Sequence, residues 1–167
     1  MDEQAKKTAL RMIPYGLYVM TAAVGDDKIA AATVNWVTQA SFQPPVVAVG
    51  VKKESGIHAI AQESGYFALN ILGKGQQGAA FAFFKAVQRD NNTINGEPFT
   101  FGSTGAPKLE SVPAVVECQL IQVVPVGDHD IFLGEVVDAE VREIPEGRPD
   151  AHTLRLEDLG ENVFYGG

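Results

Sequence analysis

Short apolar runs separated by turn-forming residues make up most of the chain. The runs are rich in Val, Ile, Thr, Ala and aromatic residues, a composition that favours strands once turn residues bound it. They occupy residues 15–24, 29–42, 46–51, 66–72, 114–127 and 129–144. Because the edges of a sheet of this size must be paired or covered, the pattern predicts a mainly β fold with a closed, six-stranded antiparallel barrel.

Helical spacing of apolar residues occurs in short segments between these runs. Residues 2–13 carry Leu10 and Ile13 on one side and end at a proline. A second short helix is expected after Ser55, which has the side chain of a helix N-cap. Residues 73–87 predict a third helix, and residues 88–113 predict a long irregular excursion. With no internal repeat and no linker, we expect one domain over residues 1–167.

Composition restricts the class of protein further. The formal net charge is −8, which disfavours nucleic acid as a partner because phosphate backbones need a basic face. No apolar run approaches the length of a membrane span, and no signal peptide is recognisable. The single cysteine, Cys118, excludes an intramolecular disulfide and indicates a reducing cytoplasm. We interpret its apolar surroundings as those of a core residue.

Charge is distributed unevenly along the chain. Residues 1–108 contain 10 Lys and Arg against 8 Asp and Glu, whereas residues 109–167 contain 3 against 13. An anionic ligand is therefore expected on the first two thirds of the molecule. The KKES sequence at 52–55, followed by the start of a helix, is a candidate anion site, although a solvated loop with an ordinary helix cap would show the same pattern.

The candidate binding stretch is the strand at 29–42. It begins with small alanines, which let a flat ligand approach the backbone, and continues with hydroxyl, amide and indole groups that make directional hydrogen bonds. An amphipathic strand with one face in water would show the same alternation. Gly50, in the next apolar run, is expected to allow close packing of a neighbour.

A glycine-rich motif, GKGQQG at 73–78, matches the dinucleotide fingerprint in its glycine spacing. The acidic residue expected about 20 positions later at the end of a parallel strand is missing, because Asp90 falls in a polar loop. The strands also lack the long intervening helices of a doubly wound fold. This pattern disfavours a Rossmann domain.

Six further motifs follow one another in the chain: IPYGLYVMTA, ATVNWVTQASFQPPVVAV, YFALNILG, INGEPF, GAPKLE and GDHDIFLGEV. In this order they resemble the flavin reductase-like family of FMN-binding split barrels. Flavoredoxin and the flavin reductase modules of flavodiiron proteins are the most similar members, because they share a segment like WVTQASF. The resemblance covers about residues 10–143 and leaves 144–167 outside.

The resemblance implies a homodimer with FMN near the subunit interface and NADH or NADPH as the electron donor. The cofactor-binding residues that it implies are Thr33, Val34, Asn35, Trp36, Ser41, Phe42, Lys53, Ser55 and His58. The first four would follow the isoalloxazine ring, the next two the ribityl chain and phosphate, and the last three the phosphate. The family loop that often carries Arg, Ser and Thr reads KKESGIH here, so the phosphate ligands depart from the common pattern.

The expected reaction is hydride transfer from NAD(P)H to N5 of the flavin, so few catalytic side chains are needed. His129, in the GDH turn, is the candidate catalytic residue, although a turn histidine also serves as a structural hydrogen bonder. No spacing typical of metal ligands or of an acyl-transfer triad occurs. An electron carrier reduced by a partner protein, and a non-catalytic FMN-binding module, stay open as alternatives.

Overall fold

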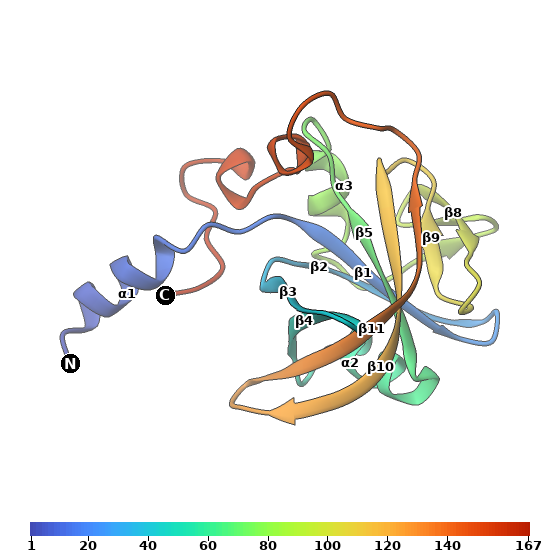
Figure 1. The fold of residues 1–167 in the computed structure, drawn as a ribbon, viewed down its shortest axis with the longest axis horizontal. Coiled ribbons are helices and arrows are strands. Elements are labelled where there is room, and N and C mark those ends of the chain that lie inside the picture. Colours follow the sequence, from blue (N-terminus) through green and yellow to red (C-terminus); the bar gives the residue numbers. More distant parts are fainter.

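The computed structural model describes residues 1–167 and consists mainly of strands (Figure 1). The strands of the main sheet are β1 (Tyr18–Val24), β2 (Lys28–Val34), β3 (Val37–Phe42), β4 (Pro45–Lys52), β5 (Tyr66–Ile71), β10 (Ala114–Pro125) and β11 (His129–Val141). They follow the order β2-β1-β5-β10-β11-β4-β3, and every neighbouring pair is antiparallel. The prediction of a mainly β fold is confirmed, and the antiparallel order excludes a doubly wound Rossmann domain.

The main sheet has seven strands where six were expected, because the run at 29–42 is divided. It breaks at Asn35 and Trp36 into β2, which pairs with β1, and β3, which pairs with β4 at the other edge of the sheet. Two residues span at most about 11 Å between the Cα atoms of Val34 and Val37. The two edges of the curled sheet therefore meet at this crossover. They share no hydrogen-bonded ladder, so the expected closed six-stranded barrel is not confirmed.

Two apolar clusters fill the interior on either side of the curled sheet. One contains Met20, Phe67 and Phe132 and packs under helix α2 (Gly56–Ser64), and the other contains Leu17 and Leu72. Cys118, in the first cluster, is fully buried, and burial raises the pKa of its thiol to about 12. The interpretation of this cysteine as a core residue is confirmed.

Residues 88–113, expected to be irregular, form a second small sheet. Its strands are β6 (Arg89–Asp90), β7 (Thr93–Ile94), β8 (Glu97–Phe101) and β9 (Pro107–Leu109). The prediction was wrong because strands of two to five residues between glycine and asparagine turns carry little periodic signal. Ile94, Phe99 and Leu109 bury their side chains in the second core cluster, so this sheet covers one end of the core.

The helical elements are short. They comprise α1 (Glu3–Arg11), α2, α3 (Gln77–Ala82) and the 3₁₀ turns η1 (Pro149–His152) and η2 (Leu156–Leu159). Figure 1 shows α1 projecting from the body of the molecule, with the last residues of the chain beside it. Arg11 Nε donates a hydrogen bond to the carbonyl of Gly166 at 3.3 Å, which ties these two segments together. None of the helices has the length and apolarity needed to cross a membrane.

Candidate functional site

A cavity of about 380 Å³ lies beside the Asn35–Trp36 crossover. Its walls come from the end of β2, the end of β4, the start of α2, the residues after α3, the first residue of β11 and the segment 156–165. Most of the lining is apolar, with a few hydrogen-bonding and charged groups at its ends. Such a combination suits a flat organic ring with a polar or anionic tail.

The end of β2 is held in place by bonds to α3 and to the end of the chain. Thr33 Oγ1 donates to the carbonyl of Ala80 at 2.7 Å, and its backbone N–H donates to the carbonyl of Phe83 at 3.2 Å. Asn35 is buried, and its Nδ2 donates to the carbonyl of Tyr165 at 3.2 Å. Thr33, Val34 and Asn35 all line the cavity. These bonds fix the polar edge of the site before any ligand arrives.

Trp36 packs behind this edge, against the glycine expected to allow close approach. A Cβ atom on Gly50 would lie 3.0 Å from Trp36 Cε3, a tight contact, so glycine lets the indole ring pack closely on the strand. The ring centroid lies 4.6 Å from that of His129. The indole Nε1 is buried and has no hydrogen-bond partner, which is rare for a polar group in a folded protein.

His129 lies at the mouth of the cavity between two oxygen atoms. Its Nδ1 is 2.8 Å from a carboxylate oxygen of Asp128, and its Nε2 is 2.7 Å from the hydroxyl of Tyr165. The hydrogen bond and charge of His129 lower the pKa of Asp128, whereas burial, and then the charge of Asp128, raise the pKa of Tyr165. A carboxylate accepts, so we assign the Nδ1 proton to the Asp128 side and let Nε2 accept from the Tyr165 hydroxyl.

The part of the cavity next to His129 carries a cation and lies at the start of α2, because His129 of β11 pairs with Lys52 of β4. Lys52 lines the cavity together with Ser55, whose Oγ accepts a bond from the His58 N–H at 3.4 Å and donates to the Lys52 carbonyl at 2.6 Å. Ser55 is thus the N-cap of α2, as the sequence predicts. The unpaired N–H groups of a helix's first turn favour an anion at this end.

Lys53 and His58 face a different partner, the buried carboxylate of Asp130. Lys53 Nζ is 3.3 Å from one Asp130 oxygen, and His58 Nε2 is 2.8 Å from the other. Burial acts to raise the pKa of Asp130, but the hydrogen bonds from His58 and Lys53 outweigh it and the pKa is lowered. Neither Lys53 nor His58 lines the cavity.

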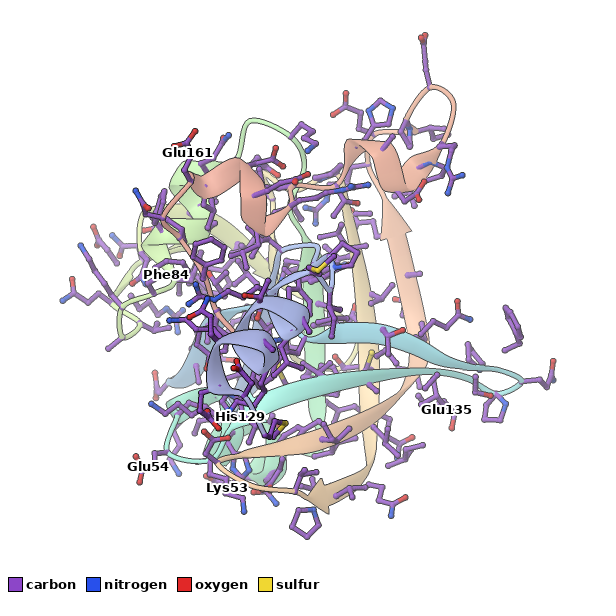
Figure 2. All side chains as sticks on the ribbon, turned by 90° about the vertical axis from the view of Figure 1, so that its left-hand side faces the viewer. Lys53, Glu54, Phe84, His129, Glu135 and Glu161 are labelled. Carbon is purple, nitrogen blue, oxygen red and sulfur yellow. The ribbon has the colours of Figure 1, made fainter.

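Ser41 and Phe42 lie away from the cavity, at the end of β3 before the turn into β4. Phe42 is 89% exposed. Ser41 and Glu135 both pair with Val46 of β4, so Glu135 marks this hairpin in Figure 2. The figure places Glu135 on the side of the molecule opposite Phe84 and Lys53.

Several cavity residues were not among those named from the sequence. They include Phe83, Phe84, Leu156, Val163, Phe164 and Tyr165. Lys52, which belongs to the KKES candidate anion site, also lines the cavity, two residues along β4 from Gly50 and so on the same face of the strand. Among residues 1–167, no three His, Cys, Asp or Glu side chains gather to hold a metal ion.

Comparison with known proteins identifies the family. The family described as "Flavin reductase like domain" matches residues 10–155. The ferric-chelate reductase (NAD(P)H) of Archaeoglobus fulgidus is 32% identical over 80% of this chain and 79% of its own length. Diflavin flavoprotein A 1 of Synechocystis sp. is 32% identical over 93% of this chain, but the chain spans only 27% of that protein.

Solved structures lead to the same assignment. BorF, the flavin reductase component of a bacterial two-component tryptophan halogenase, is 26% identical with a TM-score of 0.77, over 99% of this chain and 98% of the other. The fold is therefore that of flavin reductases. The chain belongs to the flavin reductase-like domain family, which confirms the resemblance seen in the sequence.

Proposed function

We propose that residues 1–167 form a single FMN-binding domain that reduces flavin with NADH or NADPH in a reducing cytoplasm. The observation that carries this proposal is the cavity itself, which combines a mostly apolar lining and the polar end of β2 with Lys52 and the start of α2. A flavin mononucleotide carries the matching groups, a planar ring and a phosphate dianion. The single cysteine supports the reducing compartment.

The ring end of the cavity fits an isoalloxazine. The segment Thr33–Trp36 would follow the ring edge, where the Asn35 amide and backbone N–H groups would donate to its oxygen and nitrogen atoms. Thr33, Val34 and Asn35 line the cavity, whereas Trp36 packs behind them on Gly50. The buried Nε1 of Trp36 has no partner, and a ligand acceptor that reached it would satisfy it. Donors at this edge stabilise negative charge on a reduced ring.

The phosphate end is proposed to use Lys52, Ser55 and the first N–H groups of α2. Lys53 and His58 would act behind them by holding Asp130 and the start of the helix in place. This arrangement keeps the expected location of the phosphate and adds Lys52 as the cation nearest to it. Ser41 and Phe42 lie too far along the β3–β4 hairpin to line the same cavity, so in this proposal they reach a flavin across a subunit interface.

When bound, FMN supplies the chemistry by accepting a hydride at N5 from the nicotinamide and passing the electrons on. The protein binds and orients the two rings and shields them from water. His129 is proposed to face the reaction side, with Asp128 holding its Nδ1 proton so that Nε2 is an acceptor, which bonds to the Tyr165 hydroxyl in this structure. In this role, His129 positions a polar atom of NADH or NADPH.

Anaerobic titration of the FMN-loaded protein with NADH and then with NADPH tests the proposal. We expect the visible flavin absorbance to bleach with at least one nucleotide, because hydride transfer converts the oxidised ring to the reduced one. The difference between the two nucleotides identifies the donor. Protein that takes up no FMN contradicts the proposed cofactor.

An electron carrier reduced by a partner protein is the second candidate. Its support is the acidic last third of the chain, with 13 Asp and Glu against 3 Lys and Arg, because such a face steers a basic partner. The similarity to part of a diflavin flavoprotein agrees with it. The same titration separates the candidates, since a carrier holds FMN through purification but neither nucleotide bleaches it. A non-catalytic module would in addition show no reduction by any redox partner.

We also propose that the protein is a homodimer. Large apolar side chains are exposed on the β3–β4 hairpin and at the end of β11, with Phe42, Val141 and Ile144 the most prominent. We expect sedimentation equilibrium to give twice the chain mass of 17.9 kDa. Phe42→Asp should shift the protein toward the monomer, whereas Lys28→Ala, at the exposed first residue of β2, should not. A wild-type protein that sediments as a monomer at high concentration contradicts the homodimer.

A further inference from the structure

The segment Gly160–Gly167, named the strap below, lies across the mouth of the cavity. Three of its residues, Val163, Phe164 and Tyr165, form one wall of that cavity. The same three residues and Leu156 also line a second cavity of about 360 Å³, on the side of α1. The strap is therefore a partition between two spaces and closes the candidate site on this side.

Tyr165 contacts three of the groups that the proposed function assigns to a ring nucleotide. Its carbonyl accepts the Asn35 amide, and its hydroxyl bonds to His129 Nε2. Its ring lies 5.3 Å from Trp36 and 5.8 Å from His129, measured between ring centroids. The ring, hydroxyl and carbonyl of Tyr165 thus already occupy the space next to Trp36, His129 and Asn35, where a ligand ring would stack and form hydrogen bonds.

The strap is held by side-chain contacts, from Arg11, Asn35 and His129, rather than by backbone bonds. No backbone-to-backbone hydrogen bond joins residues 161–167 to the body of the molecule, and the Val163 N–H bonds to Gly160 within the strap itself. Phe164 and Tyr165 remain 50% and 46% exposed. Gly160 has a φ of +128°, a conformation that suits glycine and allows the chain to turn there. Few buried contacts and a glycine at the start are typical of a segment that opens easily.

The closed strap leaves one donor beneath it unsatisfied. Trp36 Nε1 has no hydrogen-bond partner, and the position of a Cβ on Gly166 lies 3.7 Å from that nitrogen. The covered state therefore lacks a bond that an open state would gain from water or from a ligand oxygen. This separate observation favours a ligand that replaces the strap over one that slides beneath it.

We propose that Tyr165 is a placeholder, which a planar ring nucleotide displaces from Trp36, His129 and Asn35 when it binds. The strap then lowers the apparent affinity for the ring ligand, because only the open fraction of the protein binds it. This inference rests on the proposed function, since it takes the ring nucleotide to be a flavin or a nicotinamide. It identifies Tyr165 as a residue that determines ligand affinity and exchange.

Fluorescence of Trp36, the only tryptophan, reports on the strap directly. Titration with FMN should give a dissociation constant about tenfold lower for Tyr165→Ala than for the wild type, because the competing ring is gone. Tyr165→Phe, which keeps the ring and the carbonyl but loses the bond to His129, should fall between them. Equal or weaker FMN binding by Tyr165→Ala overturns the proposal.

Arg11 offers a second variant that leaves the cavity lining intact. Its guanidinium lies 4.2 Å over the Phe164 ring and bonds to Gly166, so Arg11→Ala should release the strap and also strengthen FMN binding. Arg148→Ala removes the same charge from an exposed site that pairs with Asp150, and should leave the affinity unchanged.

Acrylamide quenching of Trp36 without flavin tests the opening of the strap separately from the proposed flavin-binding function. Quenching should rise in Tyr165→Ala and Arg11→Ala and stay at the wild-type value in Arg148→Ala, whatever the protein binds. If quenching rises but neither the wild type nor a variant binds FMN or FAD, the strap opens as inferred but the proposed function is wrong. The assignment of a ring nucleotide as the ligand that displaces Tyr165 is then overturned. If quenching does not rise, the strap is a fixed wall and the inference is wrong, even if FMN binds.

Discussion

Replacing Glu117 by Ala lowers the free energy of unfolding by about 3–5 kcal/mol, the cost typical of breaking a buried charged network. Glu117 is 2% exposed, in the middle of β10. One carboxylate oxygen accepts the Ser103 N–H at 3.2 Å, and the other accepts the Thr104 N–H at 2.9 Å and its hydroxyl at 2.6 Å. Lys108 Nζ lies 3.8 Å away. Removing the buried acceptor deprives the Ser103 and Thr104 donors of their protein partner and detaches the loop between β8 and β9 from the main sheet.

Urea denaturation followed by circular dichroism measures this loss. Glu143→Ala is a matched control, because that side chain is exposed and forms no ion pair, and it should change the free energy of unfolding by less than about 0.5 kcal/mol. Glu117→Gln should lie between the two, since the amide oxygen still accepts one or two of the bonds. A loss below about 1 kcal/mol for Glu117→Ala would show that the network does not stabilise the fold.

The strands of the main sheet were predictable because each lies in an apolar run bounded by turn residues. β4 begins at Pro45, and β5 lies between Gly65 and Gly73; the buried positions of β4 are all valines, and those of β5 include Phe67 and Leu69. The division of the 29–42 run was not predictable in this way. Asn35 and Trp36 are tolerated in strands, and their departure from the sheet depends on tertiary contacts, namely the Asn35 bond to Tyr165 and the packing of Trp36 on Gly50.

The candidate site was predicted in part for a related reason. Thr33, Val34 and Asn35 follow one another in the chain, so a local pattern could indicate them together, and they do line the cavity. Phe83 and Tyr165 come from segments far apart in the sequence, and nothing local shows that they face β2. The resemblance implied Lys53 and His58 as phosphate ligands, but both contact the carboxylate of Asp130, which is 72 positions away from His58 in the sequence.

The neighbouring lysines, Lys52 and Lys53, should therefore differ in their effect on FMN binding. Lys52→Ala should weaken FMN binding by about 10-fold to 100-fold, since a bond from a cation to a phosphate contributes about 1.5–3 kcal/mol. Lys52 lines the cavity beside Ser55 and the first turn of α2, whereas Lys53 is paired with Asp130 at 3.3 Å. Lys53→Ala should weaken binding less than fivefold, through the position of the helix alone. Isothermal titration calorimetry with FMN measures both constants.

Riboflavin, which lacks the phosphate, decides whether the effect of Lys52 is electrostatic. Both lysine variants should bind riboflavin as the wild type does, because the ring end of the cavity is unchanged. The FMN loss in Lys52→Ala should also shrink at high salt, as counterions screen a phosphate contact on a partly exposed side chain. A loss shared by FMN and riboflavin would mean that Lys52 shapes the cavity. A larger loss in Lys53→Ala than in Lys52→Ala would place the phosphate on the Asp130 side of the helix.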